Sequence, residues 1–406
     1  MSNNFEQLGI TPCFVKRLEE RLIKDPTDIQ NKIIPLLLNG DSVFFTSATG
    51  TGKTFAYLLP LLSLIQEDSQ GIKLLVLAPT LELCTQINSE LEYLLEGTEL
   101  KSVLLIGSVN IERQIENLKN TKPDIIIGSP NRLLILARKK IIRLNNLKSL
   151  VLDEADRLVS DEMIDDTTEL LNLIMRYSKN NKDFVIGACS ATINIKNKDK
   201  LLSALNLNNA ALSKLSFIES EDNEILRDKI EHWAIFSEKR KKDQTLRSFL
   251  SAVQNTPKKK KVAVKVLIFT SRGDEAAFVL SRLQYHHINA VGLFGKAGKR
   301  ALSANDRKAA LDDFRSGEKN VLVSTDLAAR GLDITGVTHV ISLDVPQDSE
   351  VYIHRCGRTA RAGRRGVMVT IGDETQMRLL AAMEKKLRIK IFPKELHYGQ
   401  VTAPLL

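Results

Sequence analysis

Short apolar segments alternate with amphipathic segments along most of the chain, and this pattern predicts an α/β fold. The short segments are apolar throughout, as in strands buried on both faces of a parallel sheet. The longer segments carry apolar residues at helical spacing. In the first half, the pattern predicts strands at residues 43–46, 73–78, 103–106, 124–128, 149–153 and 184–190, and helices at 54–64 and 82–95.

The second half repeats this alternation. It predicts strands at residues 264–270, 289–293, 320–324, 339–343 and 366–371, and helices at 274–283 and 306–314. The lone Trp233 lies in a strand pattern that opens this half, and we assign it to packing. We therefore expect two doubly wound parallel-sheet domains, residues 1–215 and 229–394, with a charged linker at 216–228 and a short tail at 395–406.

Composition narrows the class of protein. The 406 residues are 43% hydrophobic and 26% charged, which is ordinary for a globular chain. Four scattered cysteines, without histidines at metal-ligand spacing, argue against a disulfide framework and a zinc site. No apolar stretch approaches the roughly 18 residues that span a bilayer, and no secretory signal opens the chain, so we expect a cytoplasmic protein. The net charge of +9 suits a polyanionic partner.

A glycine-rich loop follows the first predicted strand and precedes a helix, the position of a phosphate-binding loop. Gly50 and Gly52 let backbone amides approach phosphate oxygens. Lys53 would then contact the β- and γ-phosphates, and Thr54 would contact Mg²⁺. The alternative is a plain turn before a helix. The loop residues are Ser47, Ala48, Thr49, Gly50, Thr51, Gly52, Lys53 and Thr54.

An acidic cluster follows the predicted strand at residues 149–153. Its carboxylates are Asp153, Glu154 and Asp156. In isolation such a cluster is usually a solvated turn. Beside a phosphate loop, Asp153 is placed to hold Mg²⁺ and Glu154 to orient and deprotonate the attacking water.

A basic cluster lies at residues 354–361 of the second half. Arg358 and Arg361 are three residues apart, so on a helix they would share one face. Hydrolysis of a γ-phosphate needs positive charge beyond that of Lys53, and these arginines would supply it from the second domain. A solvated basic helix is the alternative.

Taken together, the motifs resemble those of DEAD-box RNA helicases of superfamily 2. The resemblance covers residues 5 to about 390 and implies two tandem RecA-like domains that use ATP and Mg²⁺. Beside the phosphate loop and Asp-Glu-Ala-Asp at 153–156, it rests on Pro-Thr-Asp-Ile-Gln at 26–30, Ala-Pro-Thr-Leu-Glu-Leu at 78–83, Ser-Pro-Asn-Arg at 129–132, Ser-Ala-Thr at 190–192, Thr-Asp-Leu-Ala-Ala-Arg-Gly-Leu-Asp at 325–333, and His-Arg-Cys-Gly-Arg-Thr-Ala-Arg at 354–361.

The resemblance implies further nucleotide-site roles. Gln30 should read adenine, whose N6 and N7 match a side-chain amide. Phe5 lies at the family's usual separation from Gln30 and should help pack the base. Asp333 should contact the ribose, and Arg358 and Arg361 the γ-phosphate. The residues implied in coupling the nucleotide state to the domains and the RNA are Asp156, Ser190, Thr192 and His354.

The resemblance also implies RNA contacts through sugar and phosphate, largely independent of base sequence. Family members bend one strand between closed domains and unwind short duplexes locally. The RNA-binding residues implied here are Pro79, Thr80, Gly107, Ser129, Pro130, Arg132, Arg272 and Thr325.

Several RNA-side positions depart from the family pattern. Leu81 replaces an arginine, Ala304 replaces a glutamine, Ser108 replaces a second glycine, and Arg272 stands where a threonine is usual. We therefore expect retained ATP hydrolysis with altered RNA affinity. Two basic segments, 258–261 and 296–300, are either solvated loops or extra contacts to RNA or a partner.

Two other functions share some of these features. An RNA clamp or assembly scaffold with slow ATP turnover would share these motifs. A DNA translocase is disfavoured by Asp156 and Gln30. We expect a monomer that acts on single-stranded RNA or short duplexes without a membrane, with RNP or ribosomal particles as candidate partners. Ribosome assembly, mRNA turnover and rescue of cold-trapped RNA are all compatible with the motifs.

Overall fold

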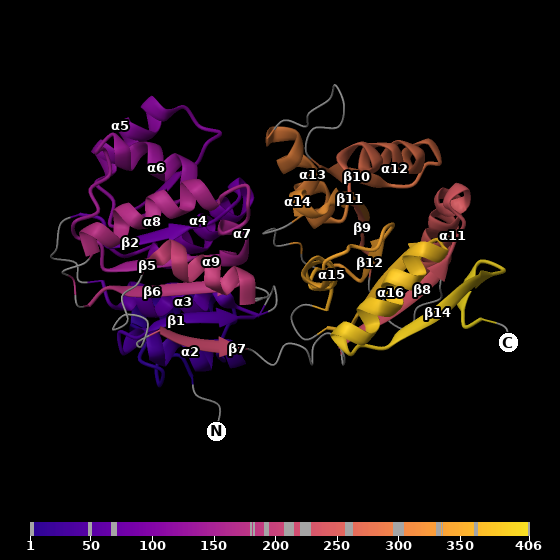
Figure 1. Cartoon of the computed structure of the whole chain (residues 1–406), viewed down its shortest axis with the longest axis horizontal. Helices are drawn as coiled ribbons and strands as arrows, with labels where there is room; N and C mark the ends of the chain where they lie inside the picture. Colours follow the sequence, from indigo (N-terminus) through magenta and orange to yellow (C-terminus); the bar gives the residue numbers. More distant parts are fainter. Residues whose placement is uncertain are drawn as a thin grey trace. The chain divides into compact units, whose positions relative to one another are not determined.

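The chain folds into two compact units, Met1–Ser220 and Glu221–Leu406 (Figure 1). The computed structural model describes residues 4–47, 51–65, 71–178, 181, 183–190, 195–206, 215–219, 229–255, 263–294, 304–329, 334, 336–360 and 364–404. Each unit is a parallel sheet with helices on both faces, so the predicted fold class is confirmed. No helix within these ranges is long and apolar enough to cross a membrane.

In the described part of the first unit, seven strands form one sheet in the order β3-β4-β2-β5-β6-β1-β7. Every pairing in it is parallel. Strands β2, β4, β5 and β6 are buried along their whole length. The strands are β1 (Ser42–Thr46), β2 (Leu74–Leu77), β3 (Ser102–Leu105), β4 (Ile125–Gly128), β5 (Ser149–Leu152), β6 (Val185–Ser190) and β7 (Leu215–Glu219).

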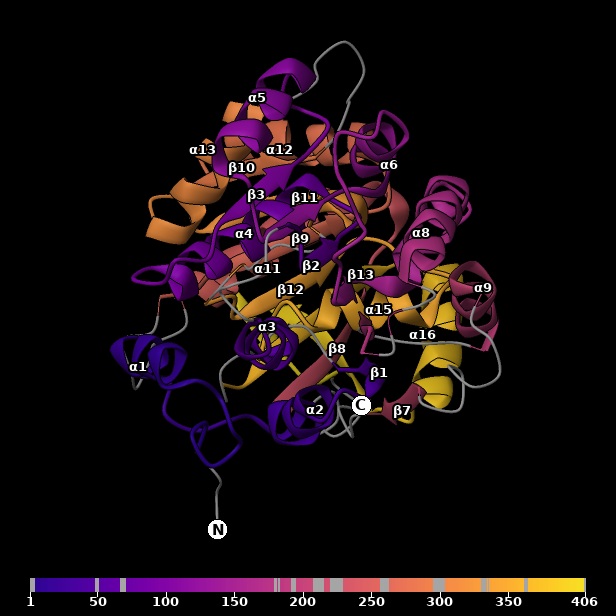
Figure 2. The same ribbon diagram turned by 90° about the vertical axis from the view of Figure 1, so that its left-hand side faces the viewer.

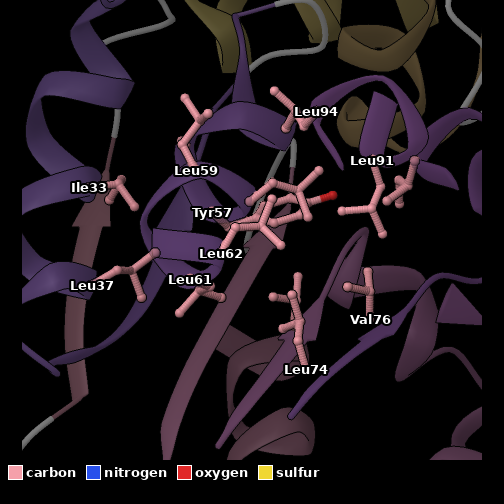
Figure 3. Packing of buried hydrophobic residues seen from close by; sticks show 14 of the residues in the cluster. Ile33, Leu37, Tyr57, Leu59, Leu61, Leu62, Leu74, Val76, Leu91 and Leu94 are labelled. Carbon is pink, nitrogen blue, oxygen red and sulfur yellow. The ribbon is translucent and has the colours of Figure 1, made fainter. Parts of the chain in front are cut away.

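Two hydrophobic clusters lie on the opposite faces of this sheet, because strand residues alternate in direction. Helices α1 to α4 cover one face and α5 to α9 the other (Figure 2). On the first face, Tyr57 packs among leucines of α3 and α4 and strand β2 (Figure 3). The helices are α1 (Pro12–Glu20), α2 (Asp28–Leu38), α3 (Lys53–Ser63), α4 (Leu81–Leu95), α5 (Ile111–Thr121), α6 (Pro130–Arg138), α7 (Ala155–Leu158), α8 (Ile164–Ser178) and α9 (Ile195–Leu205).

The second unit has eight strands in its described residues, in the order β10-β11-β9-β12-β13-β8-β14-β15. Only the pairing of β14 with β15 is antiparallel. The strands are β8 (Ile230–Phe236), β9 (Val266–Thr270), β10 (Ala290–Leu293), β11 (Val321–Thr325), β12 (His339–Ser342), β13 (Gly366–Gly372), β14 (Ile391–His397) and β15 (Gln400–Thr402).

Helices cover both faces of this sheet as well. Helices α11 and α12 pack on one face, and α13 to α16 on the other. They are α11 (Lys242–Asn255), α12 (Gly273–Tyr285), α13 (Ala304–Ser316), α14 (Asp326–Ala329), α15 (Ser349–Cys356) and α16 (Glu374–Leu387), and the 3-10 helix η2 (Lys239–Lys241) precedes α11.

The two sheets share one strand order. Numbered within its own unit, each runs 3-4-2-5-6-1-7, and the second sheet adds β15 beyond its seventh strand. The seventh strands, β7 and β14, lie beside the first strands, β1 and β8. The units are therefore topological repeats.

The seventh strand of each unit lies where the sequence predicts a linker or a tail. Residues 215–219 form β7, so the predicted linker at 216–228 overlaps a strand of the first sheet. The predicted tail at 395–406 overlaps β14 and contains β15. Both strands lie near sheet edges, where exposed positions break the continuous apolar pattern that marked the central strands. Residues 220–228 lie outside the described ranges.

Deleting residues 391–406 should destabilise the second unit. The deletion removes β14 from β8 and removes Leu396 and Val401, which pack against the cluster around α11. We expect a loss of about 2 kcal/mol in free energy of unfolding. The chain has a single tryptophan, Trp233 on β8, so urea unfolding followed by its fluorescence reports on this unit. A deletion of residues 403–406 alone is the control, and an unchanged midpoint in the longer deletion would contradict the assignment.

Candidate functional site

The phosphate loop lies at the carboxyl edge of the first sheet. It leaves β1 at Ser47, and α3 begins at Lys53 with Gly52 as its N-cap. The Ser47 amide donates to the Ser190 carbonyl at 3.0 Å, which joins the loop to the end of β6. Within the loop, Lys53 Nζ donates to the Ser47 carbonyl at 2.6 Å, and the Ser47 and Thr51 hydroxyls are 2.6 Å apart. The predicted loop residues Ala48, Thr49 and Gly50 lie outside the described ranges.

Gln30 is hydrogen-bonded to this loop. It is 2% exposed, and its Nε2 donates to the Gly52 carbonyl at 3.0 Å. Its Oε1 accepts from the Thr27 amide at 2.8 Å, within the capping box that starts α2. The start of α2 and the start of α3 are thereby held together. A Cβ on Gly52 would lie 2.4 Å from Gln30 Nε2, and Gly52 has φ +92°, so only glycine fits there.

Phe5 lies apart from any open surface. Its side chain is 1% exposed and belongs to the cluster beneath α1 to α4. The structure gives this ring a packing role, and its predicted contact with a base stays a prediction.

The Asp153 carboxylate is held by three donors. The Tyr57 hydroxyl donates to Oδ2 at 2.8 Å. Oδ1 accepts from the Glu154 amide at 2.8 Å and from Cys189 Sγ at 3.1 Å. Asp153 is 3% exposed, and burying a carboxylate is unfavourable without such partners.

Tyr57 and Cys189 stay protonated and therefore remain donors. Burial raises the pKa of both groups well above their ordinary values, and the nearby Asp153 charge raises them further. The nearby Thr54 hydroxyl partly offsets the pKa rise at Tyr57. Tyr57 thus contacts Asp153, one of the two side chains predicted to bind Mg²⁺.

Glu154 lies in a left-handed backbone conformation, with φ 49° and ψ 52°. This is uncommon for a residue other than glycine, and such residues cluster at functional sites. It is the N-cap of α7, where the Leu158 amide donates to its carbonyl at 3.1 Å. Asp156 lies in the first turn of this helix. Thr192 lies outside the described ranges.

Two of the predicted RNA-binding residues of the first unit are in contact. Arg132 Nη2 donates to the Gly107 carbonyl at 3.0 Å. Arg132 Nη1 donates to Gln114 Oε1 at 3.0 Å, and Gln114 Nε2 donates to the Ile106 carbonyl at 3.0 Å. Gln114 therefore links the arginine to the loop after β3.

The other predicted RNA-side residues of this unit begin helices. Thr80 caps α4 and accepts from the Leu83 amide at 3.2 Å. Leu81 opens α4, and Ser129 and Pro130 start α6. Pro79 and Pro130 are buried, whereas Gly107 and Ser108 are exposed.

Arg358 does not lie on a helix with His354, contrary to the predicted helical spacing of Arg358 and Arg361. Helix α15 ends at Cys356, with Gly357 as its C-cap, so Arg358 lies beyond the helix that carries His354. Glycine has a low helix propensity, and the chain turns at this point. Arg358 is 2% exposed, and its Nε donates to the His354 carbonyl at 3.4 Å. Arg361 and Asp333 lie outside the described ranges.

Arg355 organises the strand ends of this unit. Its guanidinium pairs with Asp326 at 2.7 and 2.6 Å and with Asp344 at 2.7 Å, and it also donates to Ser342. Asp344 accepts in turn from the Ser271 amide at 2.5 Å. Because a buried pair is costly to break, the loops after β9, β11 and β12 are fixed to α15.

The predicted RNA-binding residues of the second unit lie at two of these strand ends. Thr325 ends β11 and accepts from the Ala328 amide at 3.4 Å. Arg272 is the N-cap of α12, and an exposed ion pair joins it to Asp274 at 3.4 Å. Ala304 is the first residue of α13. The basic segments 258–261 and 296–300 lie outside the described ranges.

Sequence reasoning missed the residues that hold the others in place. Tyr57 follows Thr54 by three positions, a spacing that shares a helix face, and Cys189 directly precedes Ser190. These two spacings were the available signals. Gln114 had none, and Arg355 lies in the basic motif at 354–361 without a spacing that points to Asp326 or Asp344.

The fold and the site define a phosphate-loop ATPase built from two parallel-sheet units. The family model "DEAD/DEAH box helicase" matches residues 27–201, and "Helicase conserved C-terminal domain" matches residues 241–363. The chain belongs to the DEAD-box ATP-dependent RNA helicases, which are ATP-hydrolysing enzymes.

Individual relatives agree with this assignment. The DEAD-box ATP-dependent RNA helicase CshC of Bacillus cereus is 34% identical over 388 residues, which cover 96% of this chain and 92% of that protein. S. cerevisiae Dbp5 bound to RNA and ADP BeF3 is 26% identical, with a TM-score of 0.81 over 96% of this chain and 95% of that one. Mss116p bound to ssRNA and AMP-PNP is 26% identical, with a TM-score of 0.82 over 97% of this chain and 80% of that one.

Substituting Gly52→Ala should weaken nucleotide binding. The new methyl group forces the Gln30 amide away, which breaks two hydrogen bonds worth about 1 kcal/mol each, so we expect at least a roughly tenfold loss of affinity. Gly40→Ala is the matched control, because Gly40 also has a positive φ, +82°, but nothing lies within 4 Å of the new methyl group. Titration with a fluorescent ADP measures both variants. Equal affinities in the two variants would contradict the proposed role of the contact between Gln30 and Gly52.

Proposed function

We propose that this helicase hydrolyses ATP in response to RNA, and that the nucleotide closes its two units on one RNA strand. The closed state bends the strand, which separates short duplexes locally or remodels an RNP. The observation that carries the proposal is that Lys53 and Thr54 begin α3 at the sheet edge where Asp153 and Glu154 follow β5, with Tyr57 of α3 bonded to Asp153. The alternative, a slow-turnover RNA clamp or assembly scaffold, shares this site and would retain RNA in the presence of ATP without separating strands.

Thr54 and Asp153 fit Mg²⁺. This cation prefers oxygen ligands and is usually bound through one or two protein side chains together with substrate phosphates. The buried Asp153 carboxylate is bonded to Tyr57 of α3, and Thr54 lies in the first turn of this helix, whose start favours anions. When bound, the metal would neutralise charge on the phosphates. Lys53 would supply a second positive charge beside it.

Glu154 is the proposed general base. Its backbone amide is tied to Asp153 Oδ1, so the position of the base is fixed relative to the metal-binding carboxylate. The glutamate would orient the attacking water and accept its proton. Arg358 and Arg361 would stabilise the γ-phosphate from the second unit, Asp333 would hold the ribose, and Asp156, Ser190, Thr192 and His354 would couple the nucleotide state to RNA.

Gln30 can read adenine without leaving the loop. A side-chain amide has two donor hydrogens and two acceptor lone pairs. One donor is used on Gly52 and one lone pair on Thr27, which leaves one of each. Adenine presents N7 as an acceptor and N6 as a donor, whereas guanine presents only acceptors on the same edge. Phe5 would help only if the base reached its buried ring.

RNA would bind at the carboxyl edges of both sheets, through the sugar-phosphate backbone. In the first unit, the candidate ligands are Arg132 and the main chain at Thr80, Gly107 and Ser129. In the second, they are Arg272 and Thr325. The departures at Leu81, Ser108, Arg272 and Ala304 would alter RNA affinity while leaving the ATP site intact. A cytoplasmic monomer that acts on RNP or ribosomal particles stays a prediction.

Glu154→Gln should slow ATP hydrolysis by at least about 100-fold, because amide nitrogen and oxygen cannot accept the proton of water. ATP-dependent RNA binding should persist, since the charge on Asp153 and Lys53 is unchanged. Phosphate release and RNA anisotropy measure the two properties. Glu162→Gln, an exposed carboxylate eight residues further on, is the control. Full turnover in Glu154→Gln would exclude this residue as the base.

Gln30→Ala should abolish the preference for ATP over GTP. The substitution also removes part of the cap of α2, so Thr27→Ala is the matched control. Loss of that cap costs about 1 kcal/mol of stability but leaves the reading amide in place. Competition of ATP and GTP against a fluorescent ADP measures the ratio of affinities. A ratio that changes equally in both variants would show that Gln30 acts only through the cap.

A further inference from the structure

The hydroxyl of Tyr57 reaches the metal-binding edge of the first unit but takes no part in the proposed hydrolysis. Tyr57 is fully buried at 0% exposure, and its ring packs in the cluster with Leu59, Leu62 and Leu94 (Figure 3). Its hydroxyl leaves this apolar surrounding and reaches Asp153 Oδ2 at 2.8 Å. A buried hydroxyl is retained in a core only where it has partners.

The bonding direction at this hydroxyl follows from its partners. Asp153 is a carboxylate and can only accept, so the Tyr57 proton points to Oδ2. Thr54 lies three residues before Tyr57 in α3, so the two side chains share one face of the helix.

Asp153 is fixed in the same way. Tyr57 occupies one side of Oδ2, while the Glu154 amide and the Cys189 thiol occupy Oδ1. Rotation of the carboxylate would break all three bonds. Each oxygen has further acceptor capacity for metal-bound water. The bonds therefore set the orientation of the carboxylate without blocking a cation.

We propose that Tyr57 is a positioning residue for magnesium, because its hydroxyl orients the carboxylate of Asp153, which would bind the ion together with Thr54. This inference rests on the proposed function, in which those two residues hold Mg²⁺. Groups that orient metal ligands commonly change metal affinity about 10- to 100-fold when they are removed.

Tyr57→Phe isolates the hydroxyl, since the ring that fills the core is kept. Binding of a fluorescent ADP to the whole chain is measured against MgCl₂ concentration and again in EDTA. We expect the half-saturating Mg²⁺ concentration to rise about tenfold or more, with nucleotide affinity in EDTA unchanged. Tyr93→Phe is the matched control. Its hydroxyl donates to the Arg17 carbonyl at 2.6 Å and joins the last turn of α4 to α1, not to the phosphate loop.

An unchanged Mg²⁺ dependence in Tyr57→Phe overturns the proposal. So does an equal loss of affinity with and without Mg²⁺, because the hydroxyl would then act on the fold or on the nucleotide. A wild-type chain whose ADP binding ignores Mg²⁺ would refute the metal site itself. If the wild-type chain does respond to Mg²⁺ and Tyr57→Phe responds equally, only the role of Tyr57 is refuted.

Discussion

Burial of both faces of each sheet is the constraint on which the rest of the structure depends. Every residue of β2, β4 and β5 is buried in the first unit, as is every residue of β9 and β11 in the second. Unpaired polar groups are unfavourable in such strands. Chemistry is therefore confined to strand ends, where Asp153, Ser190 and Thr325 lie. Because parallel strands end at the same edge, residues distant in sequence meet there.

The same burial explains the supporting residues. A carboxylate placed at the end of a buried strand needs donors. Asp153 obtains them from Tyr57 of α3, from Cys189 of the neighbouring strand β6 and from the amide of the next residue, Glu154. In the second unit, Arg355 meets the same requirement with reversed charge, since two aspartates surround a guanidinium that is 1% exposed. Each of these buried charges thus joins the ends of neighbouring elements in its unit.

The sequence alone predicts the parts of this fold that local patterns encode. The apolar runs of the central strands, such as residues 125–128, have one interpretation because both of their faces are buried. The seventh strands were missed because β14 has exposed and partly exposed positions, and its place depends on pairing with β8, about 160 residues earlier.

The candidate site divides in the same way. Glycines, Lys53 and the carboxylates at 153–156 have recognisable spacing, whereas Tyr57 lies in an apolar run and has only its distance from Thr54 as a signal. Its role depends on a contact with a residue 96 positions away. The end of α15 at Cys356 was missed because the spacing of Arg358 and Arg361 suits a helix while Gly357 favours a break.

In the proposed function, the acidic cluster hydrolyses ATP under the control of RNA. The decisive measurement is the steady-state rate of hydrolysis at saturating ATP without polymer, with single-stranded RNA and with DNA of the same sequence. We expect a slow rate without polymer, a faster rate with RNA and little change with DNA. An equal rate in all three, or stimulation by DNA that matches RNA, would contradict it.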